Sequence, residues 1–194
     1  MTARPTTGSR SFPSSHGSCC VNRGFAAFGL LVWLVGCTTP HRSPLPTVPD
    51  VDLARFMGDW YVIAHIPASL EKDAYNAVES YRLESDGSIA TTYTFREGGF
   101  DGELKTHRPT GFVRDAENRS TWGMQFLWPF EAEYLIAYLD ADYTQTIIAR
   151  NKRDLVWIMA REPALPAADY ERLVAQVKAW GYDVSALRKV PQRW

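Results

Sequence analysis

Residues 77–96 read Ala-Val-Glu-Ser-Tyr-Arg-Leu-Glu-Ser-Asp-Gly-Ser-Ile-Ala-Thr-Thr-Tyr-Thr-Phe-Arg. Both halves of this stretch follow a period of two, and the run Ser85-Asp86-Gly87 between them is typical of a tight β-hairpin turn. In a strand, successive side chains point to opposite faces of the sheet. The stretch therefore predicts two antiparallel strands that each turn one face toward a core.

The same period continues outward from this hairpin, from Val51 to Arg161, and turn residues interrupt it about every eight to twelve positions. Because no helical pattern intervenes, neighbouring strands are expected to pair in a meander, as an antiparallel sandwich or barrel. Eight strands with short connections can close on themselves, which removes exposed edges and leaves room for side chains or one small ligand. The predicted strands are residues 60–66, 77–83, 88–96, 102–113, 120–127, 133–139, 144–150 and 154–161.

A helix is predicted over residues 167–180, where the period changes to that of an α-helix. Pro166 suits its first turn and Gly181 its end. The polar face carries charges of both signs, which favours docking on the sheet over lying in a membrane surface. One apolar stripe would face the sheet, formed by Tyr170, Leu173, Val174 and Val177.

The first 36 residues have the order of a secretory signal peptide. They contain three arginines and no acidic residue, followed by an uncharged run over residues 25–36. That run is shorter than the roughly 20 apolar residues that a membrane-spanning helix needs. Its end, Leu34-Val35-Gly36-Cys37, resembles the bacterial lipobox, in which the cysteine is acylated and becomes the mature N-terminus. An ordinary export signal with an incidental cysteine is the alternative.

The chain is therefore expected to comprise a lipoprotein signal peptide (1–36), a lipid-anchored linker (37–50) and one folded domain (51–194). Four prolines in the linker favour extended chain over a packed element. All three cysteines lie at or before Cys37, so none is left in the domain. The formal net charge of −1 provides no field that would attract nucleic acid.

Three short motifs in the domain resemble those of the lipocalin family. Gly58-Asp59-Trp60-Tyr61 is similar to its Gly-x-Trp motif, Asp142-Tyr143 to the Asp-Tyr of its second motif, and Arg161 to its third. Residues 134–143 and 155–163 resemble the bacterial outer-membrane lipocalins in particular. The resemblance implies an all-β fold: an eight-stranded antiparallel up-and-down β-barrel, closed at one end by a helical turn, with one C-terminal α-helix packed outside.

The resemblance also implies roles for the motif residues as framework. Trp60 would plug the closed end, and Arg161 would lie over its indole face, where a cation–π contact is worth about 1–2 kcal/mol. Gly58 would let the backbone turn beside that ring, and Asp142, next to Tyr143, would accept hydrogen bonds from turn amides.

Alternation from Trp60 predicts which side chains face the interior of the cup. Filling of the core is the alternative for each of them, and a β-bulge would reverse the parity of its strand. An inward Glu79 is costly unless it is paired or wet, so it indicates a polar ligand headgroup, or a partner such as Arg82 or Arg96. Ala149 is also expected to face inward. The predicted ligand-binding residues are Ala64, Glu79, Tyr81, Tyr93, Phe95, Met124, Phe126, Tyr134 and Trp157.

The open rim is expected to consist of the loops 67–76, 97–101, 128–132 and 151–153. The run Trp128-Pro129-Phe130 places two large aromatic rings in a loop, as a lid, a self-association surface in a homodimer, or a contact with the membrane interface. By resemblance to the bacterial outer-membrane lipocalins, the expected ligand is a fatty acid or a lysophospholipid. The expected location is the outer membrane, facing the periplasm, with the membrane reached through Cys37.

No enzyme, metal site or cofactor is expected from the sequence. The domain contains only two histidines, His65 and His107, both expected at the solvated surface, and no nucleophile elbow, metal-ligand spacing or phosphate loop. Catalysis on a lipid with Glu79 as base is an alternative. A further alternative is a structural barrel filled by its own side chains, Trp122, Trp157 and Tyr138.

Overall fold

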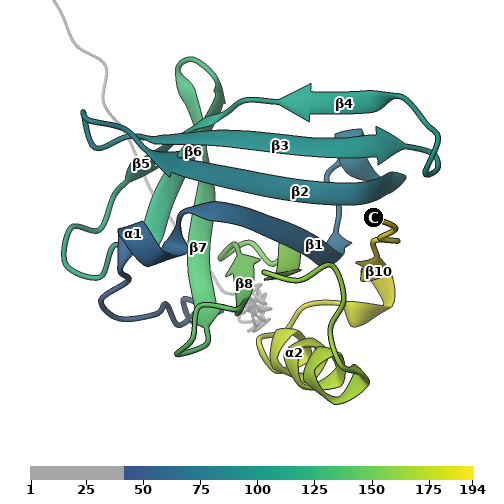
Figure 1. Cartoon of the computed structure of the whole chain (residues 1–194). Coiled ribbons are helices and arrows are strands. Elements are labelled where there is room, and N and C mark those ends of the chain that lie inside the picture. Colours follow the sequence, from purple (N-terminus) through teal and green to yellow (C-terminus); the bar gives the residue numbers. More distant parts are fainter. Residues whose placement is uncertain (1–41) are drawn as a thin grey trace, which may run out of the picture. The chain divides into compact units, whose positions relative to one another are not determined.

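The computed structural model describes residues 42–194; the expected signal peptide and Cys37 lie outside the described residues. Figure 1 shows a strongly curved antiparallel sheet with one longer helix, α2 (Ala167–Ala179), outside it. Strand pairing follows the chain order from β1 to β9, and β1 also pairs with β9, which closes the barrel. The predicted eight-stranded barrel is confirmed. The strands are β1 Gly58–Ile66, β2 Ala74–Leu83, β3 Ile89–Glu97, β4 Leu104–His107, β5 Thr110–Val113, β6 Thr121–Leu127, β7 Phe130–Leu139, β8 Gln145–Ala149, β9 Val156–Ala160 and β10 Arg188–Lys189.

The predicted strand over 102–113 is interrupted in the structure. It forms two short strands, β4 and β5, which both pair with β3 and are separated by Arg108 and Pro109. Proline has no backbone N–H and cannot donate to the ladder, so the pairing breaks there.

A short helix, α1 (Leu53–Phe56), closes one end of the barrel. Asp52 caps it by accepting a hydrogen bond from the Arg55 amide. Its last residue, Phe56, is fully buried and accepts at its carbonyl a 2.8 Å hydrogen bond from Trp60 Nε1. The helix therefore seals the end of the barrel where β1 begins.

Helix α2 (Ala167–Ala179) packs on the outside of the barrel, as predicted. Its residues Leu173 and Val177 are fully buried in a cluster with Ile63, Ala64 and other side chains of the outer sheet face. Two of the four predicted stripe residues thus form the buried contact, and Tyr170 and Val174 are partly buried at its edge. The helix covers one outer face of the sheet (Figure 1).

A β-bulge in β1 corrects the predicted parity of that strand. The register against β9 shifts between Val62 and Ala64, so Val62 lies in the interior cluster whereas Ala64 lies in the outer cluster beneath α2. Ala149 also packs in the outer cluster, since it pairs with Leu135 there. The expectations that Ala64 and Ala149 face the cup are therefore wrong.

The C-terminal segment completes the sheet beside β1. After a 3₁₀ turn, η2 (Val184–Ala186), strand β10 pairs with the second half of β1. The side chain of Gln192 then bridges β1 and β2 by donating to the carbonyls of Val62 and Ala77, at 2.8 Å and 3.2 Å. The tail is therefore inserted between the two strands where they separate, and Figure 1 shows the C-terminus at this end, opposite α1.

Part of the expected linker lies against the barrel. Leu45 is buried in the outer cluster, and its amide donates a 2.8 Å hydrogen bond to Asn151 Oδ1. Further along, the Val48 amide donates to the Ile136 carbonyl and the Val51 amide to that of Asn118. Residues 45–51 thus run along the barrel wall from the turn after β8 to the closed end.

Candidate ligand-binding cup

The barrel encloses a cavity of about 220 Å³ that opens at the end opposite α1. Most of its lining is apolar or aromatic. Seven of the predicted residues line it: Glu79, Tyr93, Phe95, Met124, Phe126, Tyr134 and Trp157. Alternation also placed Leu155 inward, and it lines the cavity. The remaining lining residues, which come from strands as well as loops, were not predicted: Ala68, Glu71, Thr91, His107, Pro109, Ala132, Glu133 and Arg150.

Aromatic rings form the floor of the cup. Trp60, Phe56 and Trp122 are buried there, with ring centroids of Phe56 at 5.1 Å from Trp60 and 5.4 Å from Trp122. Tyr81, predicted as a cup residue, belongs to this floor; it does not line the cavity. The floor fills the closed half of the barrel and leaves the other half hollow.

Arg161 secures the floor from below, in the arrangement that the resemblance implied. Its guanidinium carbon lies 3.9 Å from the centroid of the Trp60 ring. The guanidinium also donates hydrogen bonds to the backbone carbonyls around α1, and its Nη2 reaches those of Arg55, Phe56 and Met57 at 2.8–3.0 Å. These contacts fix α1 against β1.

The turn before β8 is capped by Asp140, which corrects the role expected for Asp142. Asp140 accepts hydrogen bonds from the amides of Thr144 and Gln145, each at 2.7 Å, while Asp142 is exposed. Tyr143 has a positive φ of 61° in this turn, and its hydroxyl accepts a hydrogen bond from the Asp52 amide. The turn therefore braces α1 through Tyr143.

Glu79 lies at the base of the cavity, just above the floor. Tyr81 donates a hydrogen bond to Glu79 Oε2, and the Tyr81 hydroxyl lies 2.6 Å from that of Tyr134. Burial, and secondly the charge of Glu71, raises the pKa of Glu79 to about 8. The carboxyl group therefore holds its proton at neutral pH.

Glu71 comes from η1 (Ser69–Glu71), in a loop predicted as rim, and reaches into the cup. Its side chain is 7% exposed and its Oε2 lies 3.7 Å from His65 Nδ1. Trp157 Nε1 donates to the same oxygen at 3.4 Å, and the Ala68 amide donates to the other carboxylate oxygen at 3.0 Å. Burial raises the pKa of Glu71, but His65, the Tyr93 hydroxyl and the Ala68 amide together outweigh it, so the pKa lies below its usual value.

Both histidines differ from their predicted surface positions. His65 is fully buried, because the bulge before Ala64 reverses the parity of the rest of β1 and points His65 toward Glu71. His107 lines the cavity, with its ring stacked 6.0 Å from Phe95 and 6.3 Å from Tyr93. A bulge cannot be read from alternation, so the position of His65 could not be found that way.

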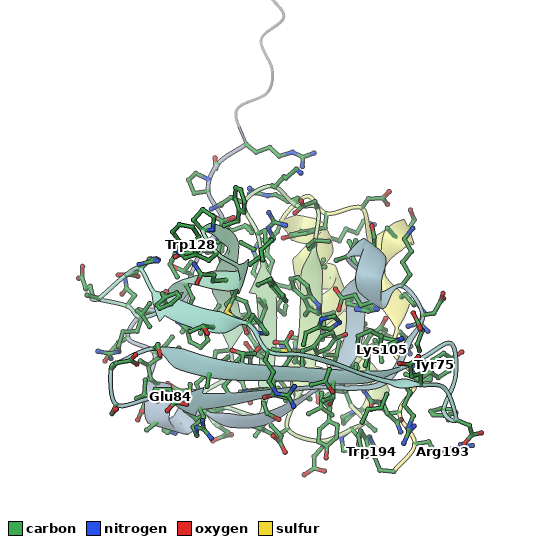
Figure 2. The ribbon with its side chains drawn as sticks, turned by 90° about the horizontal axis from the view of Figure 1, so that it is seen from above. Tyr75, Glu84, Lys105, Trp128, Arg193 and Trp194 are labelled. Atoms are coloured by element: carbon green, nitrogen blue, oxygen red, sulfur yellow. The ribbon has the colours of Figure 1, made fainter. Side chains whose placement is uncertain are left out.

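Large apolar side chains are exposed beside the mouth of the cavity. Phe126 lines the cavity and is 63% exposed, and Trp128 in the turn after β6 is 79% exposed. Leu127 and Phe130 are exposed to a similar degree. Figure 2 shows Trp128 at the periphery of the molecule. The turn is shorter than the predicted loop, since β7 already begins at Phe130.

Over residues 42–194, no cluster of three or more His, Cys, Asp or Glu side chains could hold a metal ion. In the same part of the chain, none of the helices has the length and apolar character needed to cross a bilayer.

Comparison with known proteins gives consistent matches. A family model described as a lipocalin-like domain matches residues 51–192. The outer membrane lipoprotein Blc of Escherichia coli K12 is 25% identical over 170 residues, covering 86% of this chain and 93% of that protein. Temperature-induced lipocalin-1 of Arabidopsis thaliana is 26% identical over 161 residues, covering 78% and 85%.

Solved structures resemble the chain in fold. Insecticyanin from the tobacco hornworm Manduca sexta aligns with a TM-score of 0.60 at 15% identity, covering 76% of this chain and 84% of that one. Lobster apocrustacyanin A1 aligns with a TM-score of 0.57 at 15% identity, covering 80% and 94%. At these identities the likeness concerns the barrel alone.

Proposed function

The chain belongs to the lipocalin-like family, and from this premise we propose that it stores or transports a hydrophobic molecule by enclosing its apolar part in the cup. The observation that carries the proposal is the hollow half of the barrel, a cavity of about 220 Å³ with a largely apolar wall. Each Å² of apolar ligand surface removed from water contributes roughly 25 cal/mol. A barrel filled by its own side chains would leave no such space.

A fatty acid or a lysophospholipid is the ligand class that we propose. The family resemblance to bacterial outer-membrane lipocalins supports this choice, as does the sequence similarity to the Blc lipoproteins. A single acyl chain suits a cup that is aromatic at its floor and open at one end. The process served would be the maintenance of envelope lipids.

Anchoring to the outer membrane through an acylated Cys37 is part of the proposal. Leu45, eight residues further on, is held by Asn151, and the Ser43 carbonyl accepts a hydrogen bond from Arg153. Both partners belong to the β8–β9 turn at the open end, and eight extended residues span at most about 29 Å. A lipid on Cys37 would therefore keep the mouth of the cup within reach of the membrane surface.

Native mass spectrometry of the purified protein tests ligand binding. Titration with a lysophospholipid and with a free fatty acid should give saturable one-to-one adducts. Ala132 lines the cavity, so Ala132→Trp should block the adduct, whereas Ala141→Trp, in the exposed turn at the closed end, should not. Changes at Trp157 or Tyr93 should also weaken the adduct.

A protein that takes up neither lipid at micromolar concentration would contradict the proposed ligand. Adducts that persist unchanged in Ala132→Trp would show that the lipid binds elsewhere than in the cup.

A further inference from the structure

The interior of the cup is more polar than the enclosure of an acyl chain requires. Four side chains that face or border the cavity carry titratable or hydrogen-bonding groups: Glu71, Glu79, His65 and Tyr93. Burying such groups is costly unless each finds a partner. The partners of these four side chains therefore indicate what the interior of the cup can bind.

These groups lie close together. Glu79 on β2 and Tyr93 on β3 are directly opposite each other in the strand register, so their side chains share the inner face of the barrel. Glu71 and His65 approach to 3.7 Å on the adjoining wall. The charge of Glu71 acts on both Glu79 and Tyr93. The four side chains thus form one polar cluster, which we call the inner polar cluster.

Part of the inner polar cluster has no hydrogen-bond partner among the described residues. The Tyr93 hydroxyl and both ring nitrogens of His65 are buried and make no hydrogen bond within 3.5 Å, although both side chains face Glu71. Tyr93 is 6% exposed, and its side chain lines the cavity. Buried polar groups in folded proteins are nearly always hydrogen-bonded, so the Tyr93 hydroxyl is available for a group placed in the cavity.

The charged side chains that line the cavity determine which polar group of a ligand can lie next to the inner polar cluster. Three carboxyl groups line the cavity, Glu71, Glu79 and Glu133, of which Glu79 holds its proton at neutral pH. One arginine lines it, Arg150, which lies 3.4 Å from Asp154. Arg188, whose charge reaches Tyr93, donates to the Ala74 carbonyl. A ligand carboxylate at the inner polar cluster would meet Glu71 as a like charge, whereas a hydroxyl or ammonium group could donate to it.

We propose that the inner polar cluster is a subsite for the hydroxyl or amino end of the ligand and excludes a free carboxylate. This inference rests on the proposed function, because it assumes that the cup encloses an apolar chain. It narrows the ligand class to amphiphiles whose inner end is neutral or cationic and donates hydrogen bonds. A free fatty acid that enters with its carboxylate first is disfavoured.

Three ligands of equal chain length test the subsite: decylamine, decan-1-ol and decanoate. Isothermal titration calorimetry at pH 7 should give one-to-one binding, with decylamine at least tenfold tighter than decanoate and decan-1-ol between them. Glu71→Gln keeps the size of the side chain and removes its charge, so it should reduce the ratio of decylamine to decanoate affinity several-fold. Glu79→Gln replaces a carboxyl group that is protonated at pH 7, so it should leave this ratio nearly unchanged.

Glu103→Gln is the matched control, since Glu103 is exposed and its partner is Lys105 at the surface. It removes the same charge from the molecule but should leave the affinity ratio unchanged. An equal change in Glu103→Gln would mean that only the net charge matters, and would overturn the subsite.

Arg150 indicates an alternative position for the polar end of the ligand, at the mouth of the cavity. The Nε atom of Arg150 is buried there without a hydrogen-bond partner among the described residues. If decanoate binds as tightly as decylamine or more tightly, and loses affinity in Arg150→Gln, the polar end lies at the mouth and our inference is wrong. If none of the three ligands binds although the lysophospholipid forms its one-to-one adduct, the subsite is wrong and the proposed function stands; if the lysophospholipid also fails to bind, both are wrong.

Discussion

Arg161 connects several parts of the closed end of the barrel. It stacks on Trp60, and its guanidinium donates to carbonyls of α1, of β1 and of the turn before β8. A planar guanidinium has five donors in a fixed fork, whereas a lysine ammonium is a compact point charge. The geometry around α1 therefore depends on arginine in particular.

Arg161→Lys should lower the free energy of unfolding by about 2–4 kcal/mol, since several backbone carbonyls, among them that of the buried Phe56, lose their donor. Urea denaturation followed by tryptophan fluorescence measures this loss. The exposed ion pair of Arg114 with Glu131 provides the control, and Arg114→Lys should change stability by less than about 1 kcal/mol. Equal losses in the two variants would contradict the role assigned to Arg161.

The buried Glu79 makes the stability of the folded protein fall as the pH rises. Its pKa is raised from the usual 4.5 to about 8, so the folded protein keeps a proton that the unfolded chain releases. The contribution of Glu79 to the free energy of unfolding is therefore most favourable below about pH 4.5, and it falls as the pH rises toward 8. Glu71 acts in the opposite direction, because its lowered pKa costs stability as the pH falls.

Glu79→Gln should remove the fall between about pH 4.5 and 8, which leaves the variant more stable than the wild type at pH 8 by about 2–4 kcal/mol. The measurement is the free energy of unfolding of both proteins across this range. Glu103→Gln should follow the wild-type profile. A difference between Glu79→Gln and wild type that does not vary with pH would show that Glu79 does not titrate as described.

At the scale of elements, the bulge in β1 divides the strand between two cores. Before the bulge, Trp60 and Val62 point into the barrel; after it, Ala64 packs in the outer cluster and His65 turns inward. The small Ala64 side chain lies in the same cluster as Leu173 of α2. The β1 bulge therefore determines both the surface on which α2 packs and the position of the buried His65.

Ala64→Leu should lower the free energy of unfolding by about 1–3 kcal/mol through overpacking of the outer cluster, without changing the affinity for ligand. Denaturation and calorimetric titration of the same variant separate the two effects. The matched substitution Ala132→Leu, inside the cavity, should change affinity instead. If Ala64→Leu reduced ligand affinity and left stability intact, Ala64 would face the cup after all.

On the scale of the whole molecule, the mouth of the cavity and the exposed apolar side chains near it lie at the same end of the barrel. The exposed Trp128 turn borders the cavity through Phe126, and Ser43 and Leu45 lie against the β8–β9 turn of the same end. Glu84 lies in the turn between β2 and β3 at the closed end, opposite Tyr75 and Arg193 in Figure 2.

If Cys37 carries lipid, the mouth should face the bilayer. The chain has no cysteine after Cys37, so Trp128→Cys and Glu84→Cys each accept a single polarity-sensitive fluorophore. In the anchored protein on vesicles, emission should shift to the blue for the probe at position 128 and stay unchanged at position 84. Similar shifts at both positions would contradict this orientation.

Much of the fold could be predicted from the sequence because its signals are local. A period of two and turn residues such as Asp86 and Gly87 act within a few residues, and they predicted the strands of the barrel. The helical stripe around Leu173 predicted α2 for the same reason. Motif residues such as Trp60 and Arg161 then identified the closed end.

The interior of the cup depended on contacts that only the tertiary structure decides. The bulge after Val62 forms where β1 pairs with β9, far away in the chain, and it reversed the positions predicted for Ala64 and His65. Glu71 belongs to a loop without periodicity, and folding of that loop brings it to His65 and Trp157. Local periodicity determines which residues form strands, but long-range pairing determines which of them meet inside.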